Sequence, residues 1–166
     1  MSEMKFHSQT YGKVTIDQIP EKIKIYYDKM KHFGTLFRVI VGTDSQNFDH
    51  TKMVNVIAVT CEGHGGIFFY RITHEPLIRD VRTKLHTETN ESLNIAMELT
   101  ANMEQNYKEL YDNVLFSIHI DAGKSDLGKT KELIPELVGW IKACGYDCEI
   151  KPNSYAASSI ADKISK

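Results

Sequence analysis

Long apolar stretches are absent from this 166-residue sequence. The longest uncharged apolar runs cover only a few residues, such as residues 67–70, whereas a membrane-spanning helix needs about 20. The N-terminus contains an acid at Glu3 and leads into no apolar run, which argues against a signal peptide. We therefore expect a cytoplasmic protein that does not associate with membranes.

Cysteine is also scarce. The chain has three cysteines, Cys61, Cys144 and Cys148, and an odd number without an export signal argues against a disulfide framework. Cys144 and Cys148 are four residues apart, but no second pair accompanies them, and a structural zinc site usually has four ligands. The cysteines therefore indicate neither a disulfide-rich nor a zinc-stabilised fold.

An excess of positive charge is missing too, since the formal net charge is −2. Proteins that bind nucleic acid over their whole surface are usually basic. Any contact of this protein with nucleic acid must therefore be local. A pocket of carboxylates would itself make the charge balance more acidic, so the net charge does not exclude such a site.

The length predicts one domain with a substantial core. We expect residues 1–34 to form a polar lead-in and a helix packed on that core, and residues 35–166 to form the main body. The strands are predicted at residues 36–43, 53–60, 67–72, 114–120 and 147–150. The later helices are predicted at residues 76–111, 129–144 and 155–164. Three strands with short turns, then alternating helix and strand, predict an α/β fold with a mixed five-stranded sheet flanked by helices.

Two aspartates follow predicted strands. Asp44 comes at the end of an apolar strand beside Gly42, and Asp121 ends the fourth strand before Gly123. If these strands are parallel neighbours, the two carboxylates lie side by side and repel each other unless a cation or a shared proton intervenes. Mg²⁺ prefers such hard oxygen ligands. The alternative for Asp44 is an aspartate that caps a turn.

The long helix and the last helix each add acids. On an ideal helical wheel, Glu88 lies about 50° from the centre of the apolar face and Glu91 about 110° from it, so Glu88 is expected to turn toward the sheet. Glu91 is the substitute if the helix breaks in residues 87–90, where the apolar face becomes polar. Asp162 is the acid of the last helix. For all three, the alternative is a solvated surface charge.

Several motifs resemble those of the RNase H-like superfamily, and more narrowly of its YkuK-type family. They are VGTDSQ at residues 41–46, HIDAGK at residues 119–124, IKP at residues 150–152 and ASS at residues 157–159. The resemblance runs from about Leu36 to the C-terminus. It implies a nuclease that hydrolyses RNA, DNA or an RNA–DNA hybrid with two Mg²⁺ or Mn²⁺ ions.

The resemblance also implies roles for individual residues. Asp44 would bridge the two ions, Glu88 and Asp121 would complete the ligand set, and Asp162 would lie on the side of the attacking water. The candidates for contacts with substrate phosphates are Ser45, Lys124 and Lys129. His119 and Glu91 are candidates for hydrogen bonds that hold the metal ligands in position. For His119, the alternative is a core histidine with satisfied hydrogen bonds.

A rival motif lies between the fourth strand and the next helix. The sequence GKSDLGKT, from Gly123 to Thr130, matches the phosphate-loop pattern G-x-x-x-x-G-K-T, which favours a nucleotide-binding NTPase. Too little parallel sheet follows it, no later strand supplies a metal-binding aspartate, and Asp126 adds a negative charge where phosphate would bind. The NTPase therefore stays an alternative, as does a non-catalytic nucleic-acid-binding module on the same fold.

Overall fold

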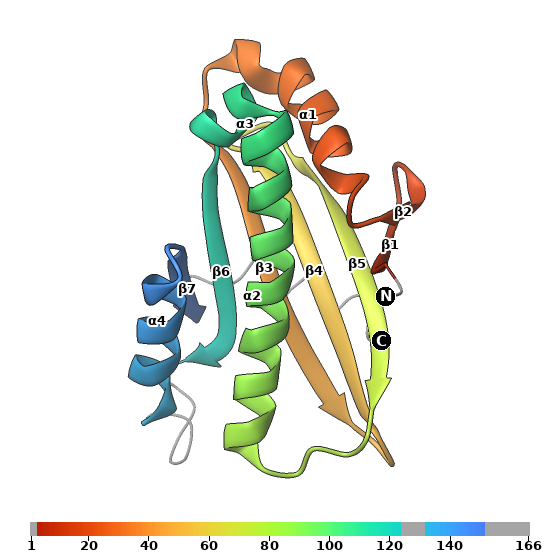
Figure 1. Ribbon diagram of the computed structural model, residues 1–166, viewed down its shortest axis with the longest axis vertical. Coiled ribbons are helices and arrows are strands. Elements are labelled where there is room, and N and C mark those ends of the chain that lie inside the picture. Colours follow the sequence, from red (N-terminus) through yellow and green to blue (C-terminus); the bar gives the residue numbers. More distant parts are fainter. Residues whose placement is uncertain (1–2, 124–131, 152–166) are drawn as a thin grey trace.

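A mixed sheet organises the protein. The computed structural model describes residues 3–123 and 132–151, and in this part of the chain seven strands form one sheet in the order β2-β1-β5-β4-β3-β6-β7 (Figure 1). The strands are β1 (Lys5–Ser8), β2 (Gly12–Thr15), β3 (Phe37–Asn47), β4 (Thr51–Cys61), β5 (Gly66–Glu75), β6 (Leu115–Gly123) and β7 (Asp147–Lys151). The helices are α1 (Ile19–Met30), the 3₁₀ turn η1 (Lys31–Phe33), α2 (Val81–Asn106), α3 (Lys108–Asn113) and α4 (Leu133–Ala143).

The predicted fold class is confirmed. Strands β3, β4 and β5 form an antiparallel meander, β6 pairs with β3 in parallel, and β7 pairs with β6 in parallel. The predicted number of five strands is wrong, because the chain before α1 adds two more strands to the edge of the sheet beside β5.

The N-terminal segment is a hairpin and not only a polar lead-in. β1 and β2 pair in antiparallel fashion, and Gly12 supplies the positive φ of +71° at the start of β2. Phe6 and Val14 are buried in the same core as α1. Strands of four residues carry only two inward side chains each, which is too short a pattern to recognise in the sequence.

Helix α2 crosses the face of the sheet (Figure 1). It begins later than predicted, at Val81, where the Asp80 side chain caps it by accepting a hydrogen bond from Thr83 N at 2.9 Å. It ends at Asn106, and α3 continues as a separate short helix. The helix does not break at residues 87–90, the condition under which Glu91 would replace Glu88, because α2 runs through them without interruption and buries Glu88.

The main core lies between the sheet and its helices. It includes Val39 and Val41 of β3 and residues of α2 and α4 such as Leu99 and Leu137. Because side chains alternate along a strand, the odd-numbered residues of β3 face α2 and the even-numbered ones face the other side. None of the described helices is long and apolar enough to cross a membrane.

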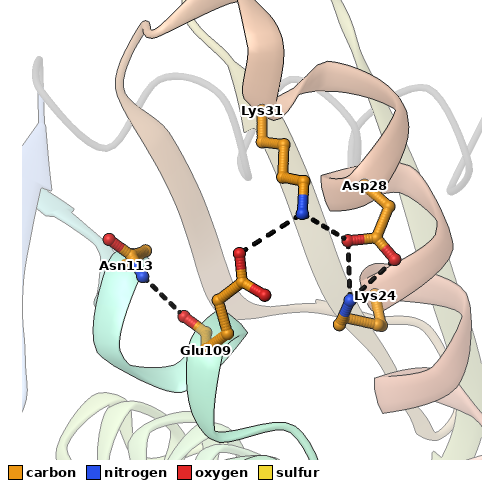
Figure 2. Close-up of polar contacts among 5 residues, drawn as sticks. All are labelled: Lys24, Asp28, Lys31, Glu109 and Asn113. Carbon is orange, nitrogen blue, oxygen red and sulfur yellow. Dashed lines mark hydrogen bonds and ion pairs between the residues drawn. The ribbon is translucent and has the colours of Figure 1, made fainter.

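Ion pairs of Lys31 in η1 link α1 to α3 at the end of the sheet where β3 and β6 begin (Figure 1). Figure 2 shows Lys31 between Asp28 and Glu109, with N–O distances of 3.5 and 3.3 Å. Lys24 and Asp28 pair at 2.6 Å within α1. These side chains are partly exposed and screened by solvent, so the pairs contribute little to stability. Asp44 and Asp121, the two aspartates predicted as metal ligands, lie toward the opposite end of β3 and β6.

Candidate carboxylate site

Asp44 lies within β3 and not at its end. The strand was expected to stop at Thr43, but β3 and β4 remain paired as far as Asn47 and Thr51. Asp44 is therefore opposite Val54 of β4, is half-buried, and accepts a hydrogen bond from Ser45 N at 2.8 Å. The sequence pattern was misleading because strand pairing carries the polar residues after Asp44 into the sheet.

Asp44 and Asp121 occupy equivalent levels of neighbouring parallel strands. β3 and β6 pair from Arg38 and Leu115 to Gly42 and His119. Asp44 and Asp121 each follow the last of these pairs by two residues. Their two strands are thus parallel neighbours, and the acids lie at the same level, just beyond the last paired residues of β3 and β6.

Glu88 is the acid that α2 buries against the sheet, as the helical wheel predicts. It is 5% exposed and accepts a hydrogen bond from Ser45 Oγ at 2.5 Å. Burial raises the pKa of Glu88 to about 8, and the negative charges of Asp44 and Asp121 contribute to this rise. The Ser45 hydrogen bond and Lys84 oppose it. Without a cation, Glu88 is therefore mostly protonated at pH 7.

Glu91 has different neighbours from Glu88. It is partly buried, and Asn55 Nδ2 donates a hydrogen bond to its Oε1 at 3.3 Å. Burial raises the pKa of Glu91, while Asn55 and the positive charge of Arg71 lower it. One turn of α2 thus directs one glutamate toward Ser45 and the other toward the buried amide of Asn55.

Asn55 is the part of the site that the sequence reasoning missed. It is completely buried in β4, donates to Thr43 Oγ1 at 2.9 Å and accepts from Arg71 Nη1 at 3.3 Å. Thr43 is also hydrogen-bonded to Ser92 of α2 at 2.8 Å. The available signal was a single amide among the otherwise apolar residues 53–59 of β4. These bonds fix β3 and β4 beneath α2 at the level of Asp44 and Glu88.

Of the other residues predicted for the site, some lie within the described part of the chain and some lie outside it. His119 is buried beside Gly42, and Ser45 is buried with its hydroxyl on Glu88. Asp162, Lys124 and Lys129 lie outside the described residues, as does most of the phosphate-loop motif. Cys61, Cys144 and Cys148 are free thiols.

The described acids are neighbours but do not form a closed ligand set. Within residues 3–123 and 132–151, no three His, Cys, Asp or Glu side chains converge closely enough to hold a metal ion. Ser45 faces α2, so its neighbour Asp44 is directed to the other face of β3. Nevertheless, the buried Glu88 carboxyl experiences the charges of Asp44 and Asp121, which a divalent cation would offset. Carboxylate oxygens are hard donors of the kind that Mg²⁺ and Mn²⁺ prefer.

Comparison with known proteins gives two matches. A family model described as "Ribonuclease H-like" matches residues 18–166. The chain is also 28% identical over 174 residues to the uncharacterized protein YkuK of Bacillus subtilis (strain 168), and the alignment covers 97% of this chain and 96% of that protein. No solved structure gives a significant match.

Proposed function

Because this chain belongs to the ribonuclease H-like family, we propose that it is a metal-dependent nuclease that hydrolyses phosphodiester bonds of RNA, DNA or RNA–DNA hybrid in the cytoplasm. The observation that carries this proposal is the buried Glu88 carboxyl, whose pKa is raised by burial and by the charges of Asp44 and Asp121. Carboxyls from β3, α2 and β6 thus affect one another electrostatically in the middle of the sheet. Clusters of this kind are typical of functional sites.

In this proposal, Asp44, Glu88 and Asp121 hold Mg²⁺ or Mn²⁺, and Asp162 is the fourth expected ligand. Bound ions of this type activate a water molecule and stabilise the leaving oxygen of a phosphodiester. Glu88 loses its proton when it becomes a ligand, because a coordinating carboxyl must be ionised. Asp44 reaches Glu88 if the end of β3 turns its carboxylate toward α2.

The neighbouring residues position these acids. Ser45 Oγ donates to Glu88 and restricts its rotamer, while the bonds of Thr43 to Ser92 and Asn55 fix the backbone of β3 just before Asp44. Ligands held by such a second layer of hydrogen bonds keep their geometry with little reorganisation.

A cleavage assay tests the proposal. Labelled single-stranded RNA, RNA–DNA hybrid, and single-stranded and duplex DNA would be incubated with the parent protein in Mn²⁺ and in Mg²⁺. The parent should cut at least one substrate, and both Asp44→Asn and Asp121→Asn should abolish cutting. Asp112→Asn, at an exposed aspartate in α3, is the matched control and should cut like the parent.

Cutting that persists in Asp44→Asn and Asp121→Asn would contradict the proposed site. Nucleic-acid binding with no cutting of any substrate would instead support the non-catalytic module. A nucleotide-binding NTPase would be stabilised by ATP with Mg²⁺, and Lys129→Ala would remove that stabilisation.

A further inference from the structure

The turn between β3 and β4 carries an unusually exposed aromatic side chain. Phe48 is 59% exposed, the highest value among the large apolar side chains described. It lies beside His50, with the ring centroids 6.0 Å apart. A single exposed ring is ordinary on a protein surface, so Phe48 becomes informative only together with the polar side chains beside it.

Two histidines and an aspartate form a hydrogen-bonded chain next to Phe48. His50 Nδ1 lies 2.5 Å from Asp49 Oδ1, and His50 Nε2 lies 2.9 Å from His74 Nδ1. A carboxylate only accepts, so His50 donates from Nδ1, and its neutral Nε2 accepts from His74 Nδ1. The Nε2 atom of the exposed His74 is thus the outward end of this hydrogen-bonded chain.

The strand register relates this chain to Asp44. Asp44, Val54 and Ile72 form one row across β3, β4 and β5, and Gln46, Lys52 and His74 form the row two residues closer to the tip. Residues two apart on a strand share a face. The ammonium of Lys52 and the imidazole of His74 therefore lie on the same face as Asp44, roughly 7 Å further along the strands.

Hydrogen bonds hold the tip in place. Asn47 Nδ2 donates to Ile78 O at 2.9 Å, Thr51 Oγ1 donates to Asn47 Oδ1 at 2.8 Å, and Ile78 N donates to Thr51 Oγ1 at 2.8 Å. These bonds attach the hairpin to the loop that leads into α2. A surface that is fixed before a ligand arrives loses less entropy on binding.

We propose that this hairpin tip, made of Phe48, His50, Lys52 and His74, binds single-stranded nucleic acid next to Asp44. An unpaired base stacks on Phe48, and the neighbouring phosphate accepts a hydrogen bond from Lys52 Nζ beside His74. A duplex keeps its bases stacked inside and cannot offer one to Phe48. The inference rests on the proposed function and narrows its substrate to strands with unpaired bases.

A matched control residue lies near the opposite end of β3. Phe33 is also an exposed phenylalanine, at 44%, and lies between two histidines, with its ring centroid 4.0 Å from that of His32 and 3.8 Å from that of His64. It belongs to η1, which precedes β3, so the length of β3, roughly 30 Å, separates it from Phe48. Phe33 and Phe48 are both exposed phenylalanines beside histidines, but only Phe48 lies near Asp44. A loss of binding in Phe48→Ala alone would therefore depend on position and not on residue type.

The test is fluorescence anisotropy with fluorescein-labelled 12-nucleotide oligo(U) and oligo(dT) and a 12-base-pair duplex, in EDTA so that no cutting occurs. The parent should bind a single strand more tightly than the duplex. Phe48→Ala should weaken single-strand binding roughly tenfold, as expected when one base–aromatic stack is removed. Phe48→Trp and Phe33→Ala should bind like the parent.

The interactions with phosphate are tested by salt dependence. Lys52→Gln combined with His74→Gln should make the slope of log K against log salt shallower by about 0.7 for each phosphate that the variant no longer neutralises. Circular dichroism would establish that each variant is folded.

The inference is overturned if the parent binds neither single strand, if it prefers the duplex, or if Phe48→Ala binds as tightly as Phe33→Ala. This failure is distinct from failure of the proposed nuclease. Loss of binding in Phe48→Ala without cleavage by the parent would retain the binding surface and reject the enzyme. Cleavage that depends on Asp44, with unchanged binding in Phe48→Ala, would support the nuclease and reject the binding surface.

Discussion

Replacing Glu88 by glutamine should change how stability depends on pH. In the metal-free folded protein the pKa of Glu88 is about 8, compared with its ordinary value of 4.5. A raised folded-state pKa means that the folded state holds the proton more tightly than the unfolded chain. The stabilisation is therefore fully present below pH 4.5 and is lost as the pH rises to about 8.

The size of this loss follows from the shift. About 3.5 pH units at 1.36 kcal/mol per unit correspond to at most about 5 kcal/mol in the free energy of unfolding. Glutamine is neutral at every pH, and its Oε1 atom can still accept the Ser45 hydroxyl. Glu88→Gln should therefore differ from the parent by less than about 1 kcal/mol at pH 5 and exceed it by several kcal/mol at pH 8.5, where the parent buries a charge.

Urea unfolding in EDTA at pH 5, 7 and 8.5 measures this difference. Glu104→Gln, at an exposed glutamate of the same helix, is the control and should follow the parent at each pH. Mn²⁺ at pH 8.5 should restore the stability of the parent and leave Glu88→Gln almost unchanged. Parallel pH profiles for the parent and Glu88→Gln would refute the reasoning that Glu88 is a desolvated carboxyl.

Three further changes test the packing around the site. Asn55→Ala leaves buried partners of the amide without their bonds and should lower the free energy of unfolding by about 1–3 kcal/mol in urea titrations. Phe6→Ala removes a fully buried ring of the N-terminal hairpin and should cost about 3–5 kcal/mol by the same measurement, whereas a surface strand would tolerate the change. Asp80→Ala removes the cap of α2 and should cost about 1 kcal/mol, seen as a lower thermal midpoint; an unchanged midpoint would contradict the capping role.

The meander and the long helix could be predicted because their patterns are long. Residues such as Val39, Val41, Val54 and Val56 are β-branched and extend over strands of eleven residues, which leaves little ambiguity. Helical periodicity likewise placed Glu88 on the buried side of α2, since the angular position of a residue depends only on spacing. The hydrogen bond from Ser45 to Glu88 could not be predicted from helical periodicity alone, because Ser45 belongs to β3.

Long-range pairing explains what the sequence did not reveal. The position of Asp44 inside β3 depends on β4 remaining paired up to Thr51, and a polar segment on its own looks like a turn. Asn55 looked like an isolated interruption of an apolar strand, because its partners Thr43, Arg71 and Glu91 come from three other elements. The N-terminal hairpin depends on the edge of β5, which is far away in sequence.

Binding of Mn²⁺ is the most direct test of the claim that Asp44, Glu88 and Asp121 form one metal site. The electron paramagnetic resonance signal of free Mn²⁺ would be titrated with the parent, Asp44→Asn, Glu88→Gln, Asp121→Asn and the control Asp112→Asn at pH 7.5. We expect the parent and the control to deplete the free signal and each of the three site variants to bind at least tenfold more weakly. Equal depletion by Asp44→Asn, Asp121→Asn and the parent would contradict the claim.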